Sequence, residues 1–141
     1  MADLLTDADV EKVLEEERIG RIGCSLDGEA YVVPMTYAYE GGSIYCHSLD
    51  GKKIAMMRAN PRVCFEVDRT HGLRDWESVI AHGTYEELSG EDAERAMLAL
   101  IARFQPTMPP VVNDSSEPKI VDRGIVFRIQ LTAKSGRAEK P

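Results

Sequence analysis

The chain has 141 residues, of which 43% are hydrophobic and 29% charged, and its formal net charge at pH 7 is -7. One domain of this length can bury a core, and the apolar fraction excludes an intrinsically disordered chain. The acidic balance argues against a nucleic-acid binder, and no apolar run approaches the roughly 20 residues that cross a membrane. Residues 1–7 contain no basic stretch followed by an apolar one, so we expect a cytoplasmic protein without a secretion signal.

The first predicted element is a helix over residues 6–18. Thr6 and Asp9 have the spacing of a capping box, and acidic residues in the first turn suit the helix dipole. Three apolar residues lie on one narrow face, so the helix should pack against the outside of the core. They are Val10, Val13 and Leu14.

Two β-hairpins are predicted next. Pro34 cannot donate a hydrogen bond to a neighbouring strand, so its strand should be bulged or lie at a sheet edge. Backbone groups left open there could bond something other than a strand, an ordinary edge strand being the alternative. Gly20 and Gly23 predict a bulge in the first strand. The strands span residues 19–26, 30–39 and 43–47, and the turns are Asp27-Gly28 and Glu40-Gly41-Gly42.

The remaining sequence alternates helices and strands. A short helix from Lys52 to about Ala59 should end before Asn60-Pro61, because proline disfavours a helical residue before it. A longer amphipathic helix follows Ser89, and residues 106–118, which include four prolines, should form a surface loop. The other predicted strands span residues 62–67, 78–85 and 124–131.

Six predicted strands, mostly joined by tight turns, favour a mainly β fold, namely a small antiparallel barrel rather than a parallel sheet. No repeat divides the chain, so we expect residues 1–141 to form a single domain. The cysteines and histidines are dispersed and show no metal-binding spacing, so we expect reduced, buried cysteines and no metal site. They are Cys24, Cys46 and Cys64, and His47, His71 and His82.

A basic segment interrupts this acidic chain between residues 47 and 62. It carries four lysines and arginines against the single acid Asp50, and Lys52 and Lys53 follow Gly51 at the predicted start of a helix. A helix N-terminus with neighbouring lysines favours a phosphate, because its free N–H groups point outward. A solvated basic helix face is the alternative, and local charge leaves both open.

No common nucleotide-binding or hydrolase motif accompanies the basic segment. The sequence contains no GxGxxG, no GxxxxGK[ST] and no GxSxG, and no Ser/His/Asp set stands out as a motif. If the protein is an enzyme, a bound cofactor therefore supplies the reactivity.

Several short motifs nevertheless occur in a particular order and spacing. Together they make residues 8–137 resemble the pyridoxamine 5′-phosphate oxidase-like FMN-binding split barrels, and the nitroimidazole-resistance (Nim-type) branch more closely. The resemblance implies a six-stranded antiparallel split β-barrel that binds FMN and forms a homodimer. The motifs are Val33-Pro34-Met35-Thr36-Tyr37, Tyr45-Cys46-His47-Ser48, Gly51-Lys52-Lys53, Asn60-Pro61, Trp76-Glu77-Ser78-Val79, Gly83 and Ser135-Gly136-Arg137.

The resemblance also implies roles for individual residues. One group would hold the FMN phosphate, one strand would bond the polar edge of the isoalloxazine ring through its backbone, and the partner chain would complete the site. His47 would face the flavin on the substrate side as a catalytic candidate. The phosphate group is Ser48, Gly51, Lys52 and Lys53; the ring strand is Val33, Pro34, Met35 and Thr36; the residues from the partner chain are Trp76, Ser78 and Val79.

Two departures from the Nim-type pattern concern the shape of this pocket. Leu49 stands where that branch has a small residue, and Trp76 stands where tyrosine is common. The arginine and histidine that bind pyridoxal phosphate in true pyridoxamine phosphate oxidases have no match here. We therefore do not predict the vitamin B6 reaction.

The function implied by the resemblance is that of an FMN-dependent oxidoreductase acting on a small substrate, with nitroaromatic compounds as the candidate class. A relative of the same fold that binds deazaflavin or haem is one alternative. A non-catalytic flavin-binding or sensing module is another, and an empty barrel used for protein interaction is a third. For His47, the alternative is a strand-end histidine satisfied by backbone groups.

Overall fold

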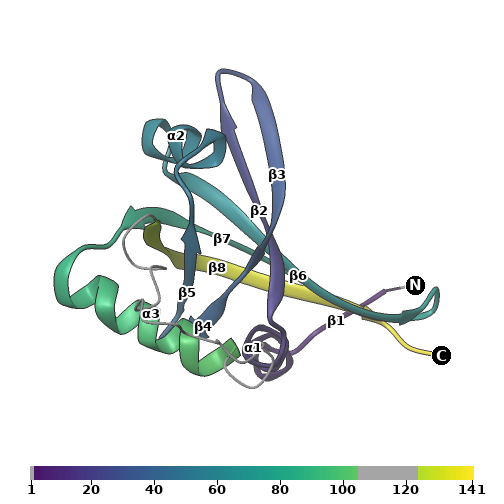
Figure 1. The fold of residues 1–141 in the computed structure, drawn as a ribbon. Coiled ribbons are helices and arrows are strands. Elements are labelled where there is room, and N and C mark those ends of the chain that lie inside the picture. The colour runs from purple at the N-terminus through teal and green to yellow at the C-terminus, as the bar shows by residue number, and fades with distance from the viewer. Residues whose placement is uncertain (1, 105–123) are drawn as a thin grey trace.

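The computed structural model describes residues 2–104 and 124–141, and within them an antiparallel sheet of eight strands forms most of the molecule (Figure 1). The elements are β1 (Asp3–Leu4), α1 (Asp7–Glu16), β2 (Ile19–Leu26), β3 (Glu29–Thr36), β4 (Ala38–Glu40), β5 (Ser43–Ser48), α2 (Lys52–Ala59), β6 (Arg62–Gly72), β7 (Asp75–Glu87), α3 (Gly90–Phe104) and β8 (Ile125–Glu139).

The sheet is curled but open. Its strand order is β3-β2-β6-β7-β8-β5-β4, with β1 paired to β8. The two end strands, β3 and β4, follow each other in the chain and are separated only by Tyr37. The chain itself therefore joins the two edges of the sheet, while no ladder of hydrogen bonds closes them in the described residues. This confirms the predicted mainly β, antiparallel split barrel.

The strand count differs from the prediction of six because tertiary contacts divide one strand and add another. The predicted strand over 30–39 breaks at Tyr37, whose side chain is fully buried. The Tyr37 amide donates to the Arg18 carbonyl (3.1 Å), and its hydroxyl donates to the Leu14 carbonyl (2.8 Å). The two-residue β1 carries no sequence signal and forms only by pairing with β8.

The turn and cap predictions are confirmed. The Asp9 amide donates to Thr6 Oγ1 (3.1 Å) at the start of α1. Asp27 and Gly28 both have positive φ, 51° and 83°, as a two-residue hairpin turn requires. Pro34 lies in β3, which is an edge strand. The predicted loop over 106–118 lies outside the described residues.

The bulge predicted around Gly20 and Gly23 is wrong, because β2 pairs with β3 without interruption from Ile19 to Leu26. Gly20 is instead needed for a close approach: a Cβ there would lie 2.3 Å from Phe65 Cε2. The observed irregularities fall in other pairs of strands, between Thr70 and Gly72 and between His82 and Gly83.

The core fills the inside of the curl, and α1 covers part of it. Val10, Val13 and Leu14 of α1 are buried there, as predicted. All three cysteines are free, with Cys24 and Cys46 buried and Cys64 half-buried. Burial raises the pKa of the Cys46 thiol far above its ordinary value, so this thiol is unreactive at neutral pH.

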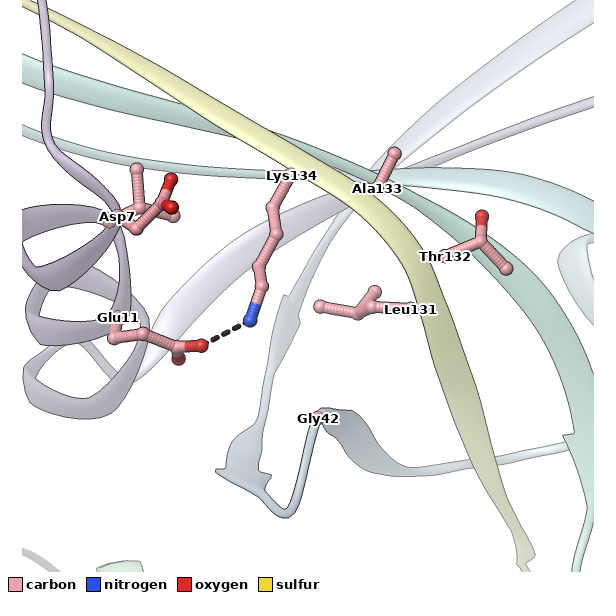
Figure 2. A pocket seen from close by; sticks show the side chains of 8 residues that line it. Asp7, Glu11, Gly42, Leu131, Thr132, Ala133 and Lys134 are labelled. Atoms are coloured by element: carbon pink, nitrogen blue, oxygen red, sulfur yellow. Dashed lines mark hydrogen bonds and ion pairs between the residues drawn. The ribbon is translucent and has the colours of Figure 1, made fainter.

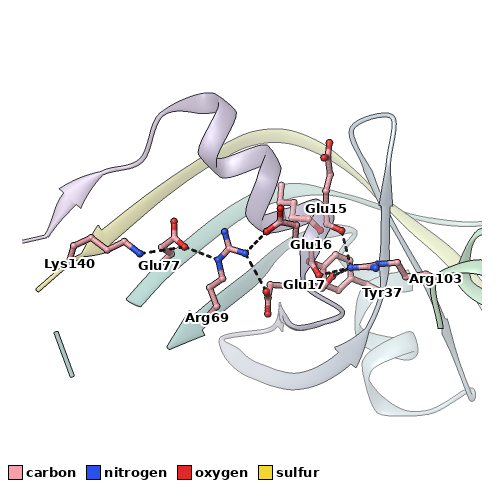
Figure 3. A network of polar contacts seen from close by, with 9 residues as sticks. Glu15, Glu16, Glu17, Tyr37, Arg69, Glu77, Arg103 and Lys140 are labelled. Carbon is pink, nitrogen blue, oxygen red and sulfur yellow. Dashed lines mark hydrogen bonds and ion pairs between the residues drawn. The ribbon is translucent and has the colours of Figure 1, made fainter. Parts of the chain in front are cut away.

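Polar contacts attach α1 to the rest of the molecule (Figure 3). Arg103 of α3 donates from Nη2 to the carbonyl oxygens of Glu15, Glu16 and Glu17, at 2.9, 2.6 and 3.2 Å. These carbonyls lie at the C-terminal end of α1, where helical carbonyls have no partner within the helix. As a result α1 and α3 meet at one end of the barrel, while α2 lies at the other end beside the β2–β3 hairpin (Figure 1).

Candidate functional site

The split between β3 and β5 leaves backbone groups open on both sides. β3 pairs with β2 along one edge, and no described strand pairs with its other edge. On the opposite side, β4 covers β5 only from Ser43 to Tyr45, so the edge from Cys46 to Ser48 extends beyond it. Such open N–H and C=O groups can bond the polar edge of a ligand.

The basic helix start lies beside this split. Gly51 is the N-cap of α2 and supplies no side-chain bond, so the first N–H groups of α2 remain free. The first turn contains no acid. Ser48 is buried just before it, and its hydroxyl donates to the Leu49 carbonyl (2.9 Å). The arrangement has the donors that a phosphate needs.

The cations of the basic segment are not equally available. Lys52 Nζ pairs with Glu29 Oε1 (3.2 Å) and lies 4.8 Å from the centre of the Tyr31 ring. Arg58 pairs with Asp50 (3.5 Å) and with Glu87. The half-buried Lys53, in contrast, makes no ion pair with any residue that the structure describes. Lys53 is thus the lysine of this helix start whose charge is available to an anion.

His47 lies on β5 with its neighbour Cys46 pointing into the core. Its Nε2 is buried and has no hydrogen-bond partner among the described residues. Gly124 packs directly against it, since a Cβ at that position would lie 1.8 Å from His47 Nε2. A buried ring nitrogen without a partner is uncommon in proteins. The alternative for His47 is a strand-end histidine whose ring is satisfied by backbone groups. The described residues offer no such backbone partner to Nε2.

The residues of the predicted ring strand alternate in direction along β3. Pro34 and Thr36 are exposed, Val33 is half-buried, and Met35 is 9% exposed and packs in the core. In this part of the site the protein can offer backbone groups and the outward side chains of β3.

Trp76, Ser78 and Val79 lie away from α2 within one chain. Ser78 pairs with Asp68 of β6. At ~3.3 Å per residue, Asp68 lies about 20 Å along the strand from Arg62, the first residue of β6 after α2. Trp76 pairs with Thr70, two residues further on, and its Nε1 donates to Glu139 Oε1 (3.3 Å). The Val79 side chain is fully buried. Within one chain, the length of β6 therefore separates Trp76 and Ser78 from the C-terminal end of α2.

Among the hollows in the described residues are two that lie outside the split. One, of about 400 Å³, lies between α1 and β8, where Lys134 pairs with Glu11 and donates to the Tyr39 hydroxyl (2.9 Å) (Figure 2). The other, of about 600 Å³, lies on strands β2, β3, β6, β7 and β8 and is called the outer-face pocket below. Its residues are Gly23, Cys24, Ser25, Ala30, Val32, Arg62, Val63, Cys64, His82, Gly83, Thr84 and Thr132.

A family model described as pyridoxamine 5′-phosphate oxidase matches residues 6–138, nearly the whole chain. This chain belongs to the pyridoxamine 5′-phosphate oxidase family. The resemblance found in the sequence is thereby confirmed.

Solved structures similar to this fold include proteins described as FAD-binding. A Mesorhizobium loti protein described as FAD-binding is 34% identical, with a TM-score of 0.80 and 99% of each chain covered. A Bacteroides thetaiotaomicron protein, provisionally assigned to 5-nitroimidazole antibiotic resistance, is 20% identical, with a TM-score of 0.78, 98% of this chain and 87% of that chain covered. A Mycobacterium smegmatis FAD-binding protein is 20% identical, with a TM-score of 0.71 and 99% of each covered.

One curated relative is 41% identical over 70 residues, an uncharacterised protein of Rhizobium meliloti. The match covers 50% of this chain and 46% of that protein, so the chain matches about half the length of its relative. The description of that relative names no activity.

This member of the pyridoxamine 5′-phosphate oxidase family has a polar cluster that the sequence analysis missed. Arg21 Nη1 of β2 contacts Glu66 Oε1 (3.3 Å) and Asp68 Oδ2 (3.1 Å) of β6. The Ser78 hydroxyl donates to Glu66 Oε2 (3.2 Å). Burial, together with the neighbouring Asp68, raises the pKa of Glu66 to about 6. The alternation of Glu66 and Asp68 with apolar residues along β6 is visible in the sequence, but the register that brings Arg21 of β2 beside them is not.

The part of the chain that the structure describes has no cluster of three metal-ligating side chains. Nor does any helix there combine the length and apolar character needed to cross a bilayer.

Proposed function

We propose that this family member binds FMN at the split of the barrel and acts as an FMN-dependent oxidoreductase. The observation that carries the proposal is Lys53, a half-buried cation without an ion-pair partner in the described residues, beside the uncapped N-terminus of α2. A phosphate there would accept charge-assisted hydrogen bonds, the stronger class of hydrogen bond in proteins.

The residues around Lys53 fit the other parts of the cofactor. Lys52, Ser48 and the Gly51 backbone would complete the phosphate contacts. The open edge of β3 around Pro34 would bond the polar edge of the ring, because alternate residues of an edge strand direct their backbone polar groups away from the neighbouring strand, here β2. The bound flavin would supply electron or hydride transfer. His47 is the residue proposed to hold a proton near the substrate, and because its Nε2 is buried against Gly124, the ring would have to turn away from this glycine to do so.

The complete site is proposed to lie between two copies of the chain. Trp76 and Ser78 are about 20 Å or more from the α2 end of β6 in one chain, at ~3.3 Å per residue. A second copy would bring its own β6–β7 region to the split. The functional unit proposed is therefore a homodimer with two shared sites, and the proposed location is the cytoplasm.

A small nitroaromatic compound is the substrate class that we propose. Its support is the likeness to the Bacteroides thetaiotaomicron protein provisionally assigned to 5-nitroimidazole resistance. At 20% identity that likeness concerns the fold, so the substrate class is tested separately by measuring the reduction of nitroimidazoles by the flavin-loaded protein.

FAD is a second candidate cofactor, favoured by one specific observation. The Mesorhizobium loti relative, 34% identical over 99% of this chain, is described as FAD-binding. FMN and FAD share the isoalloxazine ring, the ribityl chain and the first phosphate. The Lys53 site would therefore serve either flavin.

The test is the absorbance spectrum of freshly purified protein, followed by titration with FMN and with FAD. We expect yellow protein, or protein that takes up one flavin per chain, with the bound molecule identified by mass. A colourless protein that binds neither flavin would overturn the proposal. A deazaflavin or haem spectrum would replace the cofactor while keeping the fold.

A further inference from the structure

The outer-face pocket has the size of a ligand site, and its floor lacks side chains at two positions. Its volume is about 600 Å³, within the range of small-molecule pockets. Gly23 and Gly83 cannot carry side chains, because a Cβ would lie 2.7 Å from Cys64 Sγ at the first position and 2.4 Å from the Gln130 carbonyl oxygen at the second. Val32 of β3 borders this floor with 66% of its surface exposed. The pocket is therefore open to a planar, largely apolar group.

The polar groups around the pocket are donors or neutral groups. None of its twelve lining residues is acidic, although the chain carries a net charge of -7. The Arg62 guanidinium and the His82 imidazole are exposed and have no partner among the described residues, where only the backbone atoms of Arg62 and His82 form hydrogen bonds. Thr84 adds a hydroxyl. An arginine without a carboxylate partner over an uncharged floor favours an anionic ligand.

The pocket adjoins the proposed phosphate site across a single strand. Lys52 contacts Glu29 and Tyr31 of β3, and Ala30, between these two residues, lines the pocket. Successive side chains of a strand point to opposite faces, so Tyr31 belongs to the α2 side and Ala30 to the pocket side. No described strand lies beyond β3. A ligand anchored at the start of α2 can therefore pass around the free edge of β3.

We propose that the outer-face pocket binds the adenylate half of FAD, and that the chain consequently prefers FAD to FMN. The inference rests on the proposed flavin site and names its ligand more closely. Arg62 would pair with the adenylate phosphate, since guanidinium binds phosphate through two parallel hydrogen bonds. His82 and Thr84 would supply further hydrogen bonds, and Val32 with Ala30 would provide apolar surface for the purine.

The test compares dissociation constants for FMN and FAD in the wild-type chain and in Arg62→Ala. We expect FAD to bind at least about tenfold more tightly than FMN, since one charge-assisted contact corresponds to about a factor of ten or more. Arg62→Ala should weaken FAD binding by about tenfold and change FMN binding by less than about twofold. Arg95→Ala, which removes the same charge from the exposed surface of α3, should change neither constant. AMP should compete with FAD but not with FMN.

The other outcomes separate this inference from the function on which it rests. Equal affinities for FMN and FAD would overturn the adenylate site and leave the flavin site standing. A preference for FAD that survives Arg62→Ala, or an equal loss of both flavins in that variant, would also overturn it. Failure to bind either flavin would overturn both proposals. Because Arg62 is exposed, circular dichroism should show an unchanged fold in the variant.

Discussion

His47 and Gly124 are packed so closely that a Cβ on residue 124 would lie 1.8 Å from His47 Nε2. The two residues come from parts of the chain far apart in sequence, at the end of β5 and immediately before β8. No side chain larger than hydrogen fits between them unless the imidazole moves. The position of this candidate proton-holding group therefore depends on a glycine.

Gly124→Ala should displace the His47 ring and destabilise the fold. Overpacking of a close contact costs about 1–3 kcal/mol, which we expect as a loss in the free energy of unfolding measured in urea. Gly72→Ala is the matched control, because nothing lies within 4 Å of a Cβ built there and its φ is not in the left-handed region. If both variants unfold at the same urea concentration, the packing of His47 against Gly124 is not maintained in solution.

Lys53→Ala should weaken FMN binding at least about tenfold, because it removes a charge-assisted hydrogen bond to the phosphate. Riboflavin, which lacks the phosphate, should bind the variant and the wild type alike. Lys12→Ala removes an exposed lysine of α1 and serves as the charge control. Isothermal titration provides the constants. An unchanged FMN affinity in Lys53→Ala would place the phosphate elsewhere.

Arg103→Ala should destabilise α1, since three carbonyl oxygens at its C-terminal end lose their common donor (Figure 3). Hydrogen bonds to a charged group contribute about 1.5–3 kcal/mol, and we expect a loss toward the lower figure because part of this contact is exposed. Hydrogen exchange should speed up in α1 and in the last turn of α3. Arg95→Ala, in an exposed ion pair of the same helix, should leave α1 protected.

Glu66 should make stability depend on pH in an unusual direction for a carboxyl group. Its pKa of about 6 in the folded protein lies above the ordinary 4.5, so the folded state retains a proton that the unfolded chain has released. Stability is therefore lost as the pH rises from about 4.5 to about 6, by about 1–2 kcal/mol. Glu66→Gln removes this dependence.

The measurement is urea unfolding of the wild type and Glu66→Gln across this pH range. The free-energy difference between them should shift in favour of the variant as the pH rises. Glu94→Gln, which neutralises an exposed acid of α3, should follow the wild type. A parallel course for the wild type and Glu66→Gln would show that Arg21 compensates the carboxylate in full.

Local features of the sequence were enough to predict most of the elements. The Thr6 cap, the Asp27-Gly28 turn and the stop at Asn60-Pro61 act within a few residues, so their effect can be deduced without the fold. Pro34 marked an edge strand for the same reason, since a missing N–H is a property of the residue itself. The order and spacing of the short motifs also sufficed to indicate the family.

Tertiary structure decided where the chain bends and which charges remain free. Tyr37 divides the predicted strand because its amide and hydroxyl bond residues 18 and 14, a contact that no local pattern encodes. Of the basic residues around Gly51, Lys52 is paired by Glu29 and Arg58 by Glu87, acids that are distant in sequence and close in space. Lys53 and Arg62 are left without such partners in the described structure. Net charge and local charge can be summed from the sequence. Whether a particular lysine or arginine is free to bind an anion depends on which acids the fold places beside it.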